Sequence, residues 1–410
     1  MVEARASGID ERLFALREKM LDLFVEKDEA IDAVLAALVS GEPVILVGPP
    51  GTAKTQIVET LSKLIDAKYF YYLLTRFTEP DELLGPLDVV ALREGRYKRI
   101  TAGRLPEAEI AFLDEVFKAS SAIRNVLLDV ILHKRFLNGV EYFRLPLLAI
   151  YMASNEVSTD AEDAAFYDRI TLRYFGRNVS MESWPDLLTK GLRLLGNQAL
   201  SPLLKSDDVR LLQAEALRRV EKLQQQRPLL EKYIEVLAEL RQRGIQLSDR
   251  RKVKTLQVSA AYSVVHGEPE VTPESLADAV RATAPSTEED LERVEEALMR
   301  VGLSSYSVKI RQLQTLLAEL KNLCRNLMTR EIDAMEAERA LSALAARARL
   351  IMRSTGDNPR LRSYAKELER ELSRAARLLE DARARAEHEP LYGIRRGEWK
   401  GARGSEEVMR

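Results

Sequence analysis

The sequence predicts an α/β domain with a parallel β-sheet, followed by domains that contain only helices. Two observations support this fold class. Short apolar runs alternate with helical patterns over the first 180 residues, and helical periodicity alone continues after Ser180. Strands that alternate with helices are typical of a parallel sheet that helices cover on both faces. The apolar runs that we expect to form five strands are residues 43–47, 69–74, 110–113, 147–153 and 170–174.

Composition limits the classes of protein to which the chain can belong. Its 410 residues are too many for one ordinary core, so we expect two or three domains. The 62 basic and 64 acidic residues nearly balance, which gives no bulk charge for nucleic acid or an anionic membrane. Cys324 is the only cysteine and the three histidines are scattered, so neither a disulfide framework nor a zinc site is expected. Without a long uncharged apolar run or an export signal, we expect a cytoplasmic protein.

The first domain, which we place at residues 1–180, begins with two helical patterns. Apolar residues recur at helical spacing in residues 11–24 and again in residues 29–40, where Gly41 ends the second helix. The strand at residues 43–47 then leads directly into a turn rich in glycine and proline. The other four predicted strands follow in order, with helical patterns between several of them.

The second domain, residues 181–284, is predicted to be all-helical. Helix starts are indicated at Ser206, beyond Pro228, at Ser248 and at Thr272, where the next residue is a proline in the favourable first turn. Pro285 marks the next break, so we expect these helices to form one small domain.

The third domain, residues 285–410, is predicted to be a helical hairpin with a tail. Leu313 to Leu327 and Leu361 to Leu379 each carry an apolar stripe at three-four spacing, and the STGDNP stretch at residues 354–359 can turn the chain between them. From Glu389 onward the chain mixes glycines and arginines without periodicity, and we expect a flexible tail there.

The stretch VILVGPPGTAKT predicts a phosphate-binding loop. A strand, a glycine-rich turn and a helix that starts near Lys54 would direct successive backbone amides at one point, where Lys54 would reach the β and γ oxygens and Thr55 would hold Mg²⁺. Ala53 occupies a position where glycine is usual, and we expect it to be tolerated through a negative φ with its methyl directed away from the phosphate. The residues expected to contact the nucleotide are Gly48, Pro49, Pro50, Gly51, Thr52, Ala53, Lys54, Thr55 and Gln56.

Polar side chains also follow two later strands. Asp114 and Glu115 end the apolar run EIAFLDE, which suits one carboxylate for Mg²⁺ and the other for polarising an attacking water. Asn155 ends the run LLAIYMASN, where its amide can orient that water. Each pattern alone is also typical of an ordinary strand end. All three patterns together, in this order, predict a nucleotide site.

Five segments resemble the AAA+ ATPases of the MoxR group, most closely its RavA branch: GPPGTAKT, FLDEVFKASSAIRNVLLDVI, HKRFLNG, ASNE and FYDRITLR. The resemblance covers about residues 24–266, and SDRR at residues 248–251 is similar to the RavA sensor 2 region. It implies a P-loop NTPase core of the AAA+ type with a parallel five-stranded sheet and an all-α lid. Alanine before the P-loop lysine is ordinary in this group, so a working site is implied.

The resemblance assigns roles residue by residue. Because the arginine finger completes the site of a neighbouring subunit, this role would require an assembly. Arg251 remains an alternative to Arg250 for the sensor 2 role. The matching positions are Asp114 and Glu115 for the Walker B pair, Asn155 for sensor 1, Arg169 for the arginine finger and Arg250 for the sensor 2 arginine of the lid.

Two further segments resemble inserts of this clade. Residues 79–108 correspond to the helix 2 insert and residues 133–146 to the hairpin before sensor 1; both could grip a client, and both are also consistent with plain surface hairpins. One feature departs from RavA. A small β-rich module is expected in its C-terminal helices, yet residues 308–353 have no strand signal.

The expected function is a motor enzyme that hydrolyses ATP to ADP and phosphate with Mg²⁺ in a ring, expected to be a hexamer. Like its relatives, it would act as a chaperone that remodels or matures a client protein, with a von Willebrand factor A domain protein as partner. A nucleic-acid motor or loader and a nucleotide-gated scaffold remain the alternatives. The sequence leaves open the client, the ring size and the role of the C-terminal helices. It also leaves open whether ATP is preferred over GTP, because the base contacts near Phe24 and Val25 would be made by the backbone.

Overall fold

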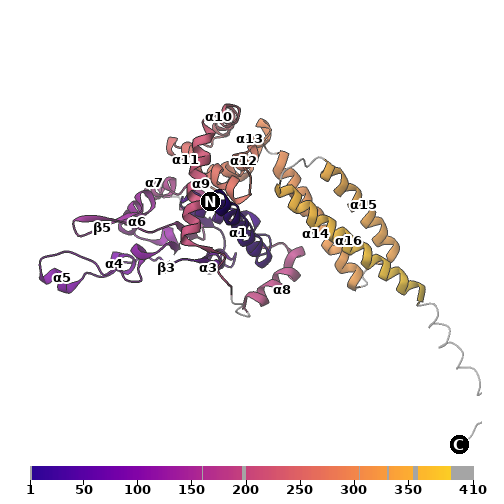
Figure 1. Cartoon of the computed structure of the whole chain (residues 1–410), viewed down its shortest axis with the longest axis horizontal. Coiled ribbons are helices and arrows are strands. Elements are labelled where there is room, and N and C mark those ends of the chain that lie inside the picture. Colours follow the sequence, from indigo (N-terminus) through magenta and orange to yellow (C-terminus); the bar gives the residue numbers. More distant parts are fainter. Residues whose placement is uncertain are drawn as a thin grey trace, which may run out of the picture. The chain divides into compact units, whose positions relative to one another are not determined.

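A computed structural model describes residues 2–158, 160–195, 200–303, 305–329, 332–353 and 359–388. The chain divides into two compact units, Met1–Ser305 and Tyr306–Arg410, whose elements are labelled in Figure 1. No helix in the described ranges combines the length and apolarity that a membrane span requires.

The first unit is built around a five-stranded sheet in the order β3-β4-β7-β1-β8, with every neighbouring pair parallel. Each strand lies within two residues of its predicted run, so the predicted sheet is confirmed. β1 lies between β7 and β8 and is fully buried, which agrees with its uninterrupted apolar sequence. The strands are β1 (Val44–Val47), β3 (Tyr69–Leu73), β4 (Ile110–Asp114), β7 (Ala149–Ser154) and β8 (Leu172–Phe175).

Helices cover both faces of this sheet, and alternate residues of β1 therefore enter different cores. Val44 and Leu46 pack in one core, while Ile45 and Val47 pack in the other. The first core is lined by α1 (Val2–Leu23), α2 (Asp28–Ser40), α3 (Lys54–Leu64), α9 (Ser206–Leu223) and α11 (Asp249–Val265). The second core is lined by α6 (Ser121–His133) and α7 (Ala161–Arg169).

Short elements form the two predicted inserts and the connections around the sheet. The first insert contains α4 (Pro80–Leu84), α5 (Val89–Arg93) and the 3-10 turn η1 (Leu105–Glu107). The second is an antiparallel hairpin of β5 (Arg135–Asn138) and β6 (Glu141–Arg144). The remaining short elements are η2 (Val116–Lys118), η3 (Met181–Ser183) and a small parallel pair, β2 (Ile65–Asp66) with β9 (Leu204–Lys205).

The predicted helical domain contains all four expected helices, but the helix expected beyond Pro228 begins at Arg227, so the proline lies in its first turn. Besides α9 and α11 it includes α8 (Trp184–Leu195), α10 (Arg227–Gln242), α12 (Pro273–Thr283) and α13 (Asp290–Val301). α13 lies beyond the predicted boundary at residue 284, yet Val294 and Leu298 share a core with Leu240 and Leu276. α13 therefore packs with the helical domain. The break at Pro285 separates two helices of that domain. The boundary near residue 180 remains a proposal.

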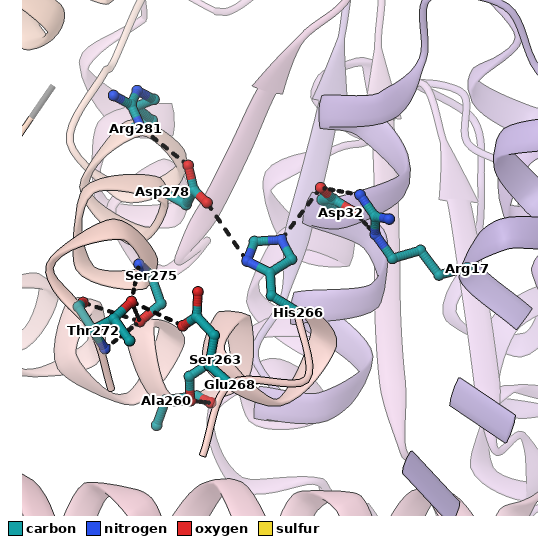
Figure 2. Close-up of polar contacts among 10 residues, drawn as sticks. All are labelled: Arg17, Asp32, Ala260, Ser263, His266, Glu268, Thr272, Ser275, Asp278 and Arg281. Carbon is teal, nitrogen blue, oxygen red and sulfur yellow. Dashed lines mark hydrogen bonds and ion pairs between the residues drawn. The ribbon is translucent and has the colours of Figure 1, made fainter. Parts of the chain in front are cut away.

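A chain of polar contacts joins the N-terminal helices to the helical domain (Figure 2). Arg17 Nε donates to Asp32 Oδ1 at 2.6 Å, and His266 Nε2 lies 3.4 Å from Asp32 Oδ2. The other ring nitrogen of His266 lies 3.7 Å from Asp278, which also pairs with Arg281. α1 and α2 are thereby tied to the end of α11 and to α12, and the buried pair of Arg17 with Asp32 would be costly to break.

The described part of the second unit contains three helices, α14 (Ser305–Thr329), α15 (Ala334–Arg353) and α16 (Pro359–His388). Buried residues of all three helices, among them Leu320, Leu344 and Leu368, form one core. The predicted hairpin is wrong in this respect, because the helical pattern of residues 308–353 is divided between α14 and α15. The described residues of this unit contain no strand, as expected. Most of the predicted turn, residues 354–358, and the tail from Glu389 lie outside the described residues.

Candidate nucleotide-binding site

The phosphate-type loop connects β1 to α3 and is held between two neighbouring strands. Gly48 N donates to Ser154 O at 3.1 Å, and Gly176 N donates to Val47 O at 2.6 Å. A Cβ on Gly48 would lie 2.5 Å from Gly176 O, so only glycine permits this close approach. The turn then passes through Gly51, which has φ of 83°.

Ala53 corrects one expectation about the loop. Its φ is 66°, in the left-handed region, and the expected negative φ is therefore wrong. Ala53 is the residue before α3, and its carbonyl accepts the hydrogen bond of Ile57 N at 2.9 Å, so the sharp turn and the first helical hydrogen bond meet at this position. The methyl packs against the first core. For alanine this conformation costs roughly 1–2 kcal/mol, which explains why glycine is usual here.

Lys54 is the first residue of α3, and its ammonium lies inside the loop. Nζ donates to Gly48 O at 2.6 Å, to Pro49 O at 3.0 Å and to Asn155 Oδ1 at 3.3 Å. Burial lowers the pKa of Lys54, and the carboxylates of Asp114 and Glu115 oppose this shift. The loop thus holds a half-buried cation at the start of a helix, where backbone amides also favour an anion.

Thr55 and Asp114 supply the oxygen atoms expected for Mg²⁺. Thr55 Oγ1 lies 3.5 Å from Asp114 Oδ2. The described residues contain no group of three or more His, Cys, Asp or Glu side chains arranged for a metal ion. One hydroxyl and one carboxylate beside a phosphate loop suit Mg²⁺, because it binds few protein oxygens and takes its other ligands from phosphate and water.

Glu115 and Asn155 are in direct contact. Asn155 Nδ2 donates to Glu115 Oε1 at 2.5 Å, and Lys118 Nζ lies 3.3 Å from the same oxygen. Lys118 was not singled out from the sequence. Its i,i+3 spacing from Glu115 in the DEVFK segment was the available signal. Lys54, Thr55, Asp114, Glu115 and Asn155 thus come together at the carboxyl ends of β1, β4 and β7, where ligands bind in open α/β sheets.

The predicted arginines lie outside this group. Arg169 ends α7 and donates to Ala165 O, while Arg250 Nη1 lies 3.9 Å from Asp168 Oδ2. Among the described residues, neither guanidinium contacts the group around Lys54. Both arginines occupy the end of α7 and the start of α11, where Ser248 Oγ also donates to Asp168 at 3.2 Å.

Arg250 and Arg251 are in different environments. The side chain of Arg250 is 46% exposed, whereas Arg251 is buried and donates to Thr283 O. Burial and the neighbouring Arg173 lower the pKa of Arg251 to about 9. Arg250 is therefore the one available to a ligand from outside the chain, and Arg251 joins α11 to the end of α12.

The two inserts pack against each other. Arg99 N donates to Asn138 Oδ1 at 2.7 Å, and a Cβ on Gly139 would lie 2.1 Å from Tyr97 O. Figure 1 shows α5 and β5 projecting at the same end of the unit. We call this surface the insert tip. Its exposed apolar side chains include Val89, Val90, Leu92, Tyr97, Leu137, Val140, Tyr142 and Phe143.

Comparison with known proteins relates the chain to a described family. Residues 11–214 match the family model described as the MoxR domain in the MoxR-vWA-beta-propeller ternary systems. Two uncharacterized proteins of Methanocaldococcus jannaschii are 36% and 35% identical over 255 and 273 residues. These matches cover 62% and 66% of this chain and span 66% and 69% of the relatives' lengths.

More distant matches extend the comparison. The chaperone MoxR1 of Mycobacterium tuberculosis is 25% identical over 152 residues, which cover 36% of this chain and 40% of the relative. A provisionally assigned ATPase structure from Cytophaga hutchinsonii has a TM-score of 0.60 and 18% identity, and covers 73% of this chain and 96% of its own. That structure supports the fold alone. With the family match and the site geometry, the chain belongs to the MoxR family of AAA+ ATPases.

Proposed function

We propose that this chain hydrolyses ATP to ADP and phosphate. The observation that carries the proposal is the meeting of Lys54, Thr55, Asp114, Glu115 and Asn155 at one edge of the sheet. Lys54 and the loop amides would bind the phosphates, and Thr55 with Asp114 would hold Mg²⁺, which supplies charge neutralisation when bound. Glu115 would polarise the attacking water, with Asn155 orienting it.

Hydrolysis should depend on assembly, because the arginines lie apart from the phosphate loop. We propose that Arg169 and Arg250, both beside Asp168, serve the nucleotide of a neighbouring copy in a ring, expected to be a hexamer. An arginine supplied across an interface raises phosphoryl-transfer rates by about 10³- to 10⁵-fold. The role proposed for Arg250 therefore differs from that of a sensor 2 arginine, which contacts the nucleotide bound to its own chain.

The test uses two variants that fail for different reasons. Arg169→Ala should bind ATP and hydrolyse it poorly, because its neighbour lacks the guanidinium. Glu115→Gln should bind ATP and lack the carboxylate that polarises water. Mixed subunits should regain turnover, since Glu115→Gln subunits still lend Arg169. Normal turnover by Arg169→Ala alone would contradict the assignment.

We propose that the energy of ATP hydrolysis is used to remodel or mature a client protein. The family description names von Willebrand factor A domain and β-propeller components, which supports a partner of the first kind. The insert tip supports a grip on polypeptide, because both inserts expose apolar side chains and the two inserts contact each other. The RavA branch also remains a proposal and rests on SDRR at residues 248–251. Affinity capture with Glu115→Gln under ATP should retain both the assembly and the client.

A nucleic-acid motor is less well supported. Several cations of the insert tip are already engaged: Arg96 pairs with Glu94, Arg99 pairs with Asp81 and Arg135 lies over the ring of Tyr142 at 4.0 Å. Salt-dependent DNA binding with DNA-stimulated hydrolysis would favour that alternative. A nucleotide-gated scaffold predicts instead that Glu115→Gln preserves function in cells.

A further inference from the structure

We propose that Lys118 is a positioning residue that restrains Glu115 and keeps ATP hydrolysis slow in the resting protein. This inference rests on the proposed function and adds a regulatory group to the same site. The Lys118 ammonium contacts Glu115 Oε1 at 3.3 Å and reaches it from the exposed side of the site. In this proposal Lys118 does not contact the nucleotide, so it would affect ATP hydrolysis only through Glu115.

The backbone fixes the two side chains relative to each other. Glu115 has φ of 55° and ψ of 45°, a left-handed conformation that is uncommon outside glycine. It precedes the single 3-10 turn η2, and Lys118 N donates to Glu115 O at 2.9 Å to close that turn. The turn returns the side chain of Lys118 over that of Glu115. A strained backbone at this position is a reason to examine the contact for function.

The same carboxylate oxygen receives two donors. Oε1 of Glu115 accepts from Asn155 Nδ2 at 2.5 Å and contacts Lys118 Nζ at 3.3 Å. An oxygen engaged in this way is poorly placed to accept a proton from water. The resting geometry therefore holds the Glu115 carboxylate in one orientation and lowers the basicity of Oε1. An attacking water must use Oε2 or displace one of the two donors.

The two restraints differ in what can release them. Asn155 also accepts from Lys54, so a triphosphate that draws Lys54 toward its oxygens disturbs the Asn155 contact directly. Among the described residues, no contact of this kind links Lys118 to the phosphate loop. Its side chain is 62% exposed, whereas that of Glu115 is 14% exposed. A phosphate that draws Lys54 away would therefore not displace Lys118 directly, and the Lys118 contact can be reached from outside the chain.

The experiment compares steady-state ATP hydrolysis by the full chain with that of Lys118→Met and Lys118→Arg. An exposed ion pair has a small energy, so we expect Lys118→Met to raise kcat about two- to five-fold with an unchanged KM for ATP. Lys118→Arg retains the cation and should restore the wild-type kcat. Lys63→Met is the matched control, since Lys63 forms an exposed ion pair with Glu59 at 2.9 Å on α3.

The proposal is overturned by a kcat for Lys118→Met that is unchanged or reduced, or by an equal rise in Lys63→Met. A rise that persists when Glu115→Gln is added would also overturn it, because the effect would not pass through Glu115. Failure of the ATPase assignment has a different signature. In that case the wild type hydrolyses no ATP above the Glu115→Gln background, and binding of a fluorescent ATP analogue is absent.

Discussion

The charged side chains at the sheet edge around Lys54 are more enclosed and more closely contacted than those at the corner around Asp168. At the edge, Lys54, Asn155 and Glu115 are joined by contacts of 2.5–3.3 Å and are largely enclosed. At the corner, Arg250 is half exposed, and its Nη1 lies as far as 3.9 Å from Asp168 Oδ2. The groups proposed to act within the chain are positioned in advance, whereas Arg250, which is proposed to act on a neighbour, is left accessible.

The strongest test of this comparison removes the enclosed cation. Lys54→Met deletes the ammonium that contacts Gly48 O, Pro49 O and Asn155, so we expect ATP binding to weaken at least 100-fold. Titration with a fluorescent ATP analogue measures the loss. Lys63→Met on the same helix should bind normally, and an equal loss there would indicate a general defect of α3.

The adjacent arginines of the corner should separate stability from catalysis. Arg251 is buried, so Arg251→Met should lower the free energy of unfolding by about 1–3 kcal/mol, because Thr283 O loses its hydrogen-bond donor. Arg250→Ala should leave the free energy of unfolding within about 0.5 kcal/mol and lower kcat. Urea denaturation and steady-state hydrolysis check the two effects. The reverse pattern would make Arg251 the functional arginine.

Glu268 is a second enclosed ionisable side chain, far in sequence from the phosphate-type loop. Burial raises its pKa to about 8, while the hydrogen bond from Thr272 opposes this shift. Because the folded pKa is the higher one, the stabilisation is complete below pH 4.5 and is lost as pH rises through 8. In that window the free energy of unfolding should fall by up to about 1.4 kcal/mol per pH unit. Urea midpoints from pH 5 to 9 should show a smaller slope in Glu268→Gln, and an identical slope would contradict the assignment.

The smallest effect is expected at Ala53. Glycine adopts φ of 66° without strain but gains more freedom in the unfolded chain, so Ala53→Gly should stabilise the protein by at most about 1 kcal/mol. ATP binding should be retained. A thermal melt with and without nucleotide checks both points. Clear destabilisation would mean that the methyl packing against the first core outweighs the backbone strain.

Most of the sheet could be predicted because each strand is an apolar run with a turn or helix signal at its ends. The site residues could be found for the same reason, since Asp114 and Asn155 stand at strand ends. The left-handed conformation of Ala53 was not predictable from its residue type, which disfavours it. Sequence periodicity also gave no indication of which core α13 joins.

The missed start of α15 had a local signal. No glycine or proline separates α14 from α15, so the helical pattern seemed continuous. Asp333 nevertheless accepts a hydrogen bond from Glu336 N at 2.7 Å, and an aspartate three residues before a glutamate is a helix-start signal. The signal was present but was outweighed by the regular spacing of the leucines.

The clasp between the two inserts has a consequence for how this protein can be recombined with its relatives. A Cβ on Gly139 would collide with the carbonyl oxygen of Tyr97, and Asn138 Oδ1 accepts a hydrogen bond from Arg99 N. A chimera that receives only one of the two segments would place a foreign surface against this contact. The two segments should therefore be exchanged together, although they are encoded in two separate parts of the gene.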